Sequence, residues 1–245
     1  MLKRKITRYL EQHLVSASNK ILLVEGARQV GKSYVIREVG QRLFANYVEL
    51  NFVTDNEGVQ LFKNVHTVDE FYLRLSSVAG DRLGNYNDTL IFLDEIQCYP
   101  QYLTLLKFLR EEQKYRFIAS GSALGMALRH TTSIPVGSVI IKKMYPLDFE
   151  EFLWANNYGE NAISDLYNHF LNQQSLSKEQ HEQLLELFRR YLLVGGLPDV
   201  VNEYLATHNI LNVRNLQNAI AAMYEADASQ YENNASRRLL IRRIY

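Results

Sequence analysis

The chain has 245 residues, of which 27 are basic and 27 acidic, and 47% of its residues are hydrophobic. This length allows one or two domains, and the zero net charge does not indicate a nucleic acid or a membrane surface as partner, although a local patch could still bind one. The single cysteine, Cys98, excludes an internal disulfide framework and suits a reducing compartment. The sequence has neither a secretory signal nor an apolar run of about 18 residues, so we expect a cytoplasmic protein without a membrane span.

The first 146 residues alternate between helix and strand patterns. In chain order, the apolar spacing predicts a helix over 2–13, a strand over 21–24, a helix over 32–43, strands over 45–52 and 89–93, a helix over 101–112, and strands over 116–119 and 139–144. Two T-x-x-E boxes, Thr54 to Glu57 and Thr67 to Glu70, predict two further helix starts, and Gly80 is expected to end the second helix. This alternation predicts an α/β fold with a five-stranded, mostly parallel sheet flanked by helices.

The pattern changes after Pro146, where strand signals stop and helical periodicity continues to the end. Asp148 with Glu151 and Ser177 with Gln180 have the spacing of capping boxes, so each pair predicts a helix start. The second part of the sequence is therefore expected to be all-helical.

The segment Gly195-Gly196-Leu197-Pro198 predicts a break followed by two more helices. The last of these is expected from about Ser236 and has no stop signal before Tyr245, which favours a chain cut within an element. The predicted organisation is a core over 1–146, a helical lid over 147–194, and the start of a truncated C-terminal domain over 195–245.

The most informative motif follows the first predicted strand. It fits G-x-x-x-x-G-K-[ST], the P-loop, and lies between a buried strand and a helix as that motif requires. Its glycines let successive backbone N–H groups face a phosphate, and the helix dipole adds to the attraction. Lys32 is expected to reach the β- and γ-phosphates of ATP, and Ser33 to place its hydroxyl on Mg²⁺. The predicted nucleotide-binding residues are Gly26, Ala27, Arg28, Gln29, Val30, Gly31, Lys32 and Ser33.

Two carboxylates, Asp94 and Glu95, end the third predicted strand. Parallel strands bring their carboxyl ends to one edge of a sheet, which is where ligands of such sheets bind. We expect Asp94 to hold Mg²⁺ through water and Glu95 to orient and deprotonate an attacking water. On its own the pair could be an ordinary solvated strand end, and the P-loop favours the catalytic interpretation.

Ser120 ends the fourth predicted strand, which in the usual order of such sheets lies between the P-loop strand and the Asp94 strand. Its hydroxyl is a candidate catalytic group that could bond the γ-phosphate or the attacking water, and the alternative for Ser120 or Ser122 is a turn or capping role. Several arginines could compensate phosphate charge, although surface arginines are commoner. They are Arg28, Arg129, Arg237, Arg238, Arg242 and Arg243, of which the last four could also meet a nucleic acid.

In this order and at these separations, the motifs resemble those of the prokaryotic AAA-type (ASCE P-loop) ATPases that carry a C-terminal domain of unknown function. The resemblance spans nearly the whole chain. Besides the P-loop, it rests on Asp94-Glu95-Ile96-Gln97, Ala119-Ser120-Gly121-Ser122, the segment Tyr-Pro-Leu-Asp-Phe-Glu-Glu-Phe over 145–152, and Gly195-Gly196-Leu197-Pro198. The last two segments are the specific ones.

The resemblance implies a five-stranded ATPase core, a helical lid from about Pro146, and a restriction-nuclease-like C-terminal domain that begins near Gly195 and is truncated here. The pair Gly137-Ser138 departs from many relatives, which have Gly-Arg or Gly-Lys there. If that basic residue senses nucleotide within or across subunits, this chain has lost it. No nuclease carboxylate set is recognisable, so no nuclease activity is expected.

The leading interpretation is an ATP-binding protein that hydrolyses ATP with Mg²⁺ and couples hydrolysis to movement of the lid and C-terminal domain. A nucleotide-gated interaction switch with little turnover is the alternative, favoured by Ser138 and by the truncation. A small-molecule kinase is disfavoured by the adjacent Glu95 and by the lack of an arginine-rich lid. A protein client and self-association are both left open as partners.

Overall fold

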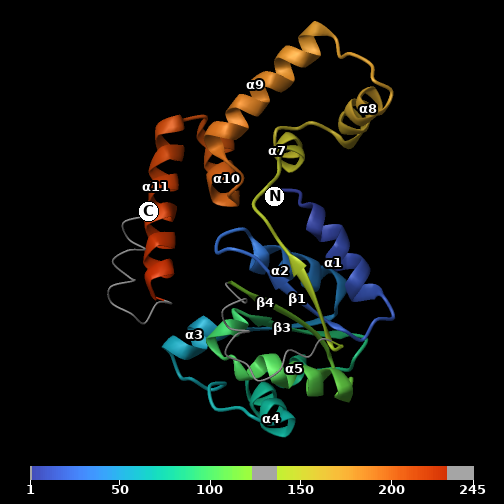
Figure 1. Cartoon of the computed structure of the whole chain (residues 1–245). Coiled ribbons are helices and arrows are strands. Elements are labelled where there is room, and N and C mark those ends of the chain that lie inside the picture. Colours follow the sequence, from blue (N-terminus) through green and yellow to red (C-terminus); the bar gives the residue numbers. More distant parts are fainter. Residues whose placement is uncertain (1, 123–136, 231–245) are drawn as a thin grey trace. The chain divides into compact units, whose positions relative to one another are not determined.

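The computed structural model describes residues 2–122 and 137–230, which form two compact units (Figure 1). The first unit runs from Lys3 to Pro146, and the second begins at Leu147. Across the described ranges, every helix is too short or too polar to span a lipid bilayer.

The first unit is built on a five-stranded sheet with strand order β2-β3-β4-β1-β5. All four strand pairings are parallel, as predicted for the sheet. The strands are β1 (Ile21–Glu25), β2 (Asn46–Asn51), β3 (Thr89–Asp94), β4 (Arg116–Gly121) and β5 (Val139–Lys143). This order places β4 between β1 and β3, so the P-loop strand and the Asp94 strand each neighbour the strand that ends beside Ser120.

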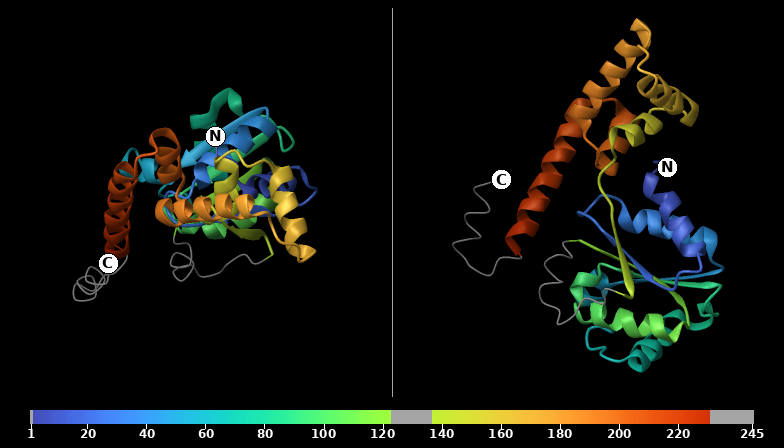
Figure 2. Two further views of the ribbon diagram at one scale, coloured as in Figure 1. Left: turned by 90° about the horizontal axis from the view of Figure 1, so that it is seen from above. Right: turned by 45° about the vertical axis from the view of Figure 1, so that its right-hand side comes forward.

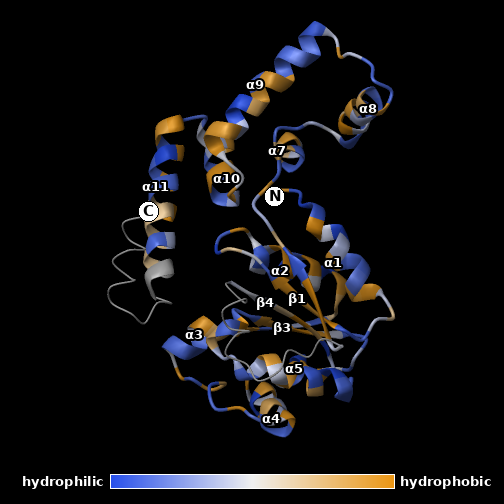
Figure 3. Ribbon diagram, viewed as in Figure 1, coloured by the Kyte–Doolittle hydropathy of each residue, from blue (hydrophilic) through white to orange (hydrophobic). Residues whose placement is uncertain are grey.

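Helices cover both faces of the sheet (Figures 1 and 2). Among the described residues of this unit, the α-helices are α1 (Lys5–Val15), α2 (Lys32–Leu43), α3 (Phe52–Glu57), α4 (Val68–Ala79) and α5 (Gln101–Glu112). Helices α1 and α2 pack together on one face, while α4 and α5 lie on the other. Strand β1 is largely hydrophobic (Figure 3), and every residue of β3 is buried, as expected for a central parallel strand.

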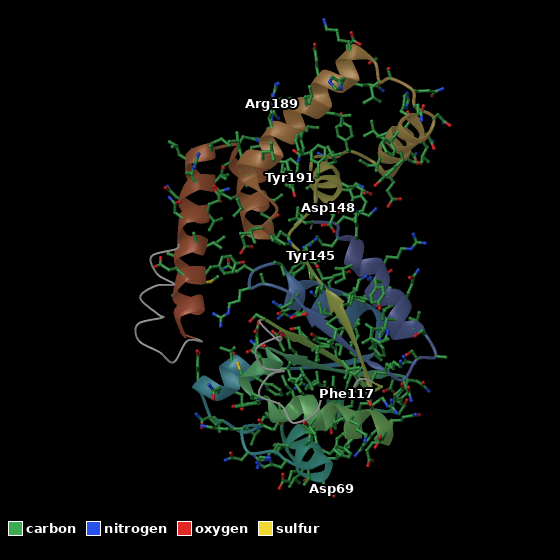
Figure 4. All side chains as sticks on the ribbon, in the orientation of Figure 1. Asp69, Phe117, Tyr145, Asp148, Arg189 and Tyr191 are labelled. Carbon is green, nitrogen blue, oxygen red and sulfur yellow. The ribbon has the colours of Figure 1, made fainter. Side chains whose placement is uncertain are left out.

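The core between the sheet and α4 and α5 is rich in aromatic side chains. Phe117 of β4 (Figure 4) packs against Phe71 of α4 with ring centroids 6.0 Å apart, and Tyr102 of α5 is fully buried beside Phe71. Aromatic pairs at this separation add stability beyond the area they bury. The sheet edge that carries the polar residues is therefore supported by a rigid, well-packed layer.

The two T-x-x-E boxes have different outcomes. Thr67 and Glu70 form the predicted capping box at the start of α4. The box at Thr54 is wrong, because α3 already starts at Phe52 and its cap is Asn51, whose side chain accepts the Thr54 N–H at 3.0 Å. Asparagine is a better N-cap than threonine, and Asn51 stands directly where β2 ends.

The described part of the second unit is all-helical, as predicted. It comprises α7 (Phe149–Ala155), α8 (Glu160–Leu171), α9 (Lys178–Val194), α10 (Pro198–Thr207) and α11 (Ile210–Gln230). The capping boxes at Asp148 and Ser177 both form. Tyr191 of α9 lies near the start of α7 (Figure 4) and donates a hydrogen bond to the Leu147 carbonyl at 2.9 Å. The helix expected from about Ser236 falls outside the described residues.

Gly196 lies where a side chain does not fit. Its carbonyl accepts the Leu147 N–H at 2.7 Å, and a Cβ added to Gly196 would lie 2.1 Å from the Leu147 carbonyl oxygen. Gly195 ends α9 with φ of 75°, and Pro198 opens α10. The glycine pair therefore combines a helix end at positive φ, which favours glycine, with a close backbone approach.

We expect Gly196→Ala to destabilise the second unit by about 1–3 kcal/mol, because one of two backbone segments must move. The only tryptophan, Trp154, lies in α7, so its fluorescence during urea unfolding reports on this unit. Gly159→Ala is the control, since a Cβ added there meets no atom within 4 Å. Equal unfolding midpoints for the two variants would contradict the packing at Gly196.

Candidate functional site

The P-loop connects β1 to α2 at the carboxyl edge of the sheet. Gly31 precedes α2 with φ of 92°, a conformation that favours glycine. Gly26 is required by space, because an added Cβ would lie 2.3 Å from the carbonyl oxygen of Met144. The loop thus has one glycine where the backbone takes a positive φ and another where the end of β5 leaves no room for a side chain.

Lys32 is buried at the start of α2, with only 4% of its surface exposed. Its Nζ donates to the carbonyl oxygens of Gly26 at 2.9 Å and Ala27 at 2.8 Å, so the ammonium group lies within the curl of the loop. Burial lowers the pKa of Lys32, and the nearby carboxylates of Glu95 and Asp94 oppose that shift. A cation held in this place is positioned to meet an anion bound by the loop.

Asp94 is the hub of the polar cluster next to the loop. Ser33 Oγ donates to its two carboxylate oxygens at 3.0 and 2.9 Å, and Ser120 Oγ donates to Oδ1. Asn51 Nδ2 donates to Oδ2 at 3.0 Å, and the Glu95 N–H donates to Oδ1 at 3.1 Å. Burial raises the pKa of Asp94, while the Ser120 and Ser33 hydroxyls favour its charged form. Four elements therefore converge on one carboxylate.

Glu95 leaves the sheet in a left-handed conformation, with φ of 55° and ψ of 48°. A non-glycine residue in this region costs on the order of 1–2 kcal/mol, and such strain is common at functional sites. Its Oε2 accepts hydrogen bonds from Ser122 Oγ at 3.1 Å and from Gln97 Nε2, and Gln97 Nε2 also lies 3.1 Å from Ser122 Oγ. The second carboxylate thus has its own pair of polar neighbours, separate from those of Asp94.

The structure brings together the predicted residues of the P-loop, Asp94, Glu95 and Ser120 at one edge of the sheet. Ser120 is fully buried and bonded to Asp94, whereas Ser122 contacts Glu95. Of the candidate arginines, Arg28 lies in the P-loop. Five lie outside the described residues: Arg129, Arg237, Arg238, Arg242 and Arg243.

Ser138 lies at the opposite edge of the sheet from the P-loop. The Ile21 N–H donates to its carbonyl at 3.0 Å, and Ile21 begins β1 whereas the P-loop follows Glu25 at the other end. At about 3.3 Å per residue, the two ends of this strand are about 13 Å apart. A basic residue at this position would not belong to the phosphate site of its own chain, so Ser138 removes no group from that site.

Three residues near the site were missed by sequence reasoning: Asn51, Gln97 and Arg4. For Asn51 a signal existed, because it lies near the end of the strand predicted over 45–52, and the structure pairs it in register with Asp94. Gln97 lies within one of the matched motifs but had no assigned role. Arg4 has no local signal at all.

The site has oxygen ligands of the kind that Mg²⁺ prefers. Ser33 Oγ and the Asp94 carboxylate are within 3.0 Å of each other, so one ion could meet both. Within residues 2–122 and 137–230, no group of three or more His, Cys, Asp or Glu side chains is placed to hold a metal. Mg²⁺ usually takes one or two protein ligands and the rest from phosphates and water, so Ser33 and Asp94 are enough protein ligands for it. The residues present therefore fit a magnesium–phosphate complex.

The sequence-based interpretation of Glu95 as the base that activates water predicts that Ser122→Ala lowers the rate of ATP hydrolysis about five- to tenfold, the value of one hydrogen bond that orients Glu95. The affinity for ATP should stay within about twofold, since Ser122 has no hydrogen bond to the P-loop among those described. Ser76→Ala is a suitable control, because its hydroxyl bonds only within α4. Steady-state phosphate release would show this, and unchanged turnover would argue against an orienting role.

Comparison with known proteins agrees with this geometry. Residues 18–153, more than half of the chain, match a family model described as an AAA domain, and residues 185–245 match a domain of unknown function, DUF8612. The chain therefore belongs to the AAA-type P-loop ATPases and carries an additional C-terminal domain of unknown function. No curated protein sequence matches it significantly.

Solved structures show a similar fold at low sequence identity. A Walker-type ATPase of Pyrococcus abyssi aligns with a TM-score of 0.56 and 12% identity over 97% of this chain and 77% of that one. PCH-2 of C. elegans aligns with a TM-score of 0.46 and 13% identity over 86% of this chain and 63% of that one. The first likeness supports the predicted α/β fold.

Proposed function

We propose that this chain binds ATP together with Mg²⁺ and hydrolyses the bond between its β- and γ-phosphates. The observation that carries the proposal is the convergence of a P-loop lysine, a serine hydroxyl and two strand-end carboxylates at one sheet edge. Membership of the AAA-type ATPases supports ATP as the nucleotide.

Phosphate binding would use the loop backbone and Lys32. The N–H groups of residues 30–33, at the end of the loop and the start of α2, would supply donors, and α2 would add the positive end of its dipole. The Lys32 ammonium, now bonded to two loop carbonyls, would turn to the β- and γ-phosphate oxygens. Ser33 and Asp94 would hold Mg²⁺, which neutralises phosphate charge when it is bound.

Hydrolysis requires a base beside the phosphates, and Glu95 is the candidate. It follows Asp94 directly, and its carboxylate accepts hydrogen bonds from Ser122 and Gln97. A carboxylate fixed in this way can orient a water molecule and take its proton as the water attacks the γ-phosphorus. Ser120, bonded to Asp94, would hold that carboxylate in place, a narrower role than contact with the γ-phosphate.

We further propose that nucleotide turnover changes the arrangement of the second unit, with a lid over 147–194 and a C-terminal domain from about Gly195. The support is that residues 143–146 leave the sheet directly beside the P-loop and continue into α7. The lone Cys98 is consistent with a cytoplasmic location. We include in the same proposal that the chain acts on a protein client and associates with itself.

The proposal is tested by measuring phosphate release from ATP with the full chain at fixed Mg²⁺. Chelation with EDTA should lower the rate of phosphate release to that of buffer, and excess Mg²⁺ should restore it. The reason is that the ion neutralises the charge of the phosphates and orients them. Replacing ATP by GTP tests whether the site prefers adenine to guanine. Release that is equal with and without Mg²⁺ would contradict the proposed site.

A second candidate function, a nucleotide-gated switch with negligible turnover, is favoured by one observation. Both Gln97 and Ser122 occupy Oε2 of Glu95, so this oxygen is less available to a water molecule. A switch would bind ATP and ADP with different affinities and release no phosphate above background. The two functions are separated by measuring ADP formed on the protein.

A further inference from the structure

We propose that Arg4 is a positioning residue of the phosphate site, which orients the Gly31 N–H toward the phosphate by holding the carbonyl of the same peptide group. Arg4 lies just before α1, far from the P-loop in sequence, and none of the motifs includes it. The inference rests on the proposed nucleotide binding and adds a residue to it.

The Arg4 side chain reaches two backbone carbonyls that are distant in sequence. Nη1 donates to the Val30 carbonyl oxygen at 2.9 Å, and Nη2 donates to the Tyr145 carbonyl oxygen at 2.6 Å. Only 6% of the Arg4 surface is exposed, and Val30 is fully buried. A charged guanidinium is costly to bury, and these two hydrogen bonds offset that cost.

The geometry of the peptide bond links Arg4 to the phosphate side of the loop. The Val30 carbonyl and the Gly31 N–H belong to one planar trans peptide group, in which they point in opposite directions. A donor fixed on the carbonyl therefore fixes the direction of the N–H. This matters most at Gly31, since glycine allows that peptide to rotate at little cost and its φ is 92°.

The positive charge of Arg4 strengthens its effect on the Gly31 N–H. A hydrogen bond from an ionised donor is about twice as strong as a neutral one, and it polarises the peptide that accepts it. The Gly31 N–H therefore becomes a better donor to an anion. The guanidinium also brings a permanent positive charge to the carbonyl side of this peptide group, opposite its N–H.

The second carbonyl ties the loop to the end of the sheet. The Met144 N–H donates to the Glu25 carbonyl at 2.7 Å, so the segment after β5 runs beside the start of the loop. Arg4 then joins the far end of the loop, at Val30, to Tyr145 in that segment. The Tyr145 side chain is 66% exposed and labelled in Figure 4, so Arg4 holds the backbone there.

The test is nucleotide affinity of the full chain, measured by calorimetry with Mg·ADP. Arg4→Met keeps the length of the side chain and removes both donors, and it should weaken binding at least tenfold. Arg4→Lys, with a single compact ammonium, should give an intermediate loss of about threefold or more. Arg8→Met on the exposed side of α1 is the control and should bind like the wild type.

A spectroscopic measurement separates positioning from general stability. With ¹⁵N-glycine labelling, one of the 12 glycine signals, that of Gly31, should shift downfield when ADP is added, and this shift should be smaller in both Arg4 variants. If Arg4→Met does not fold, Arg4→Lys decides the question by the same two measurements.

The outcomes also separate this inference from the proposed function. A wild-type chain that binds no ADP contradicts the proposed function itself. A wild-type chain that binds ADP, with Arg4 variants of equal affinity and an unchanged Gly31 shift, overturns the role of Arg4 alone.

Discussion

Replacing Lys32 by methionine should weaken ATP binding about thirtyfold or more and reduce hydrolysis to background. The ammonium group is buried in the curl of the loop, where it is held by the carbonyls of Gly26 and Ala27. Losing one partner of a buried charge pair costs about 2–5 kcal/mol, which corresponds to a loss of one and a half to four decades in affinity. Fluorescent ATP analogues titrated against the full chain would measure this.

The control for this variant is Lys20→Met, which removes a lysine from the exposed start of β1 at the other edge of the sheet. It should leave affinity and turnover within about twofold. Methionine has nearly the length of lysine and relieves the burial of charge at position 32, so we expect Lys32→Met to fold. Unchanged ATP affinity in a folded Lys32→Met protein would contradict the assignment of the P-loop.

Replacing Glu95 by glutamine should leave ATP affinity nearly unchanged and slow phosphate release by about 10²–10⁴-fold, the usual contribution of an oriented base. The amide has the shape of the carboxylate and can still accept from Ser122, but it does not take a proton from water. This combination, bound ATP without turnover, distinguishes loss of a base from loss of binding.

Glu111→Gln on the exposed end of α5 is the matched control, because it makes the same chemical change far from the P-loop. Its turnover should equal that of the wild type. Equal phosphate release by Glu95→Gln and Glu111→Gln would mean that another group activates the water.

The fold was predictable because its signals are local. A continuous apolar run marks β3, glycine and lysine mark the start of α2, and capping boxes mark α4, α7 and α9. Each signal lies within a few residues of the element it specifies. The error at Thr54 has the same origin, since a valid local box was overridden by Asn51, a better cap placed by the end of β2.

The site was only partly predictable, because half of it depends on contacts between distant segments. Motif spacing is sufficient to predict Lys32, Ser33, Asp94 and Glu95 at one sheet edge. Their partners are different: Gln97 reaches Glu95 only through the left-handed turn at Glu95.

Other placements depend on the packing of elements around the sheet. Arg4 meets Val30 only once α1 packs beside α2. Ser138 could be excluded from the phosphate site only after β5 was seen to pair with β1 from its first residue. These relationships depend on tertiary packing, which no pattern along the chain encodes by itself.

The cluster around Lys32, Asp94 and Glu95 is proposed to cleave ATP. The most direct test is a single-turnover experiment with the full chain in excess over radiolabelled ATP and Mg²⁺, quenched in acid at successive times. Protein-bound ATP should convert to equal amounts of ADP and phosphate at a rate well above that in buffer. ATP that stays bound and intact throughout would contradict hydrolysis and favour the nucleotide-gated switch.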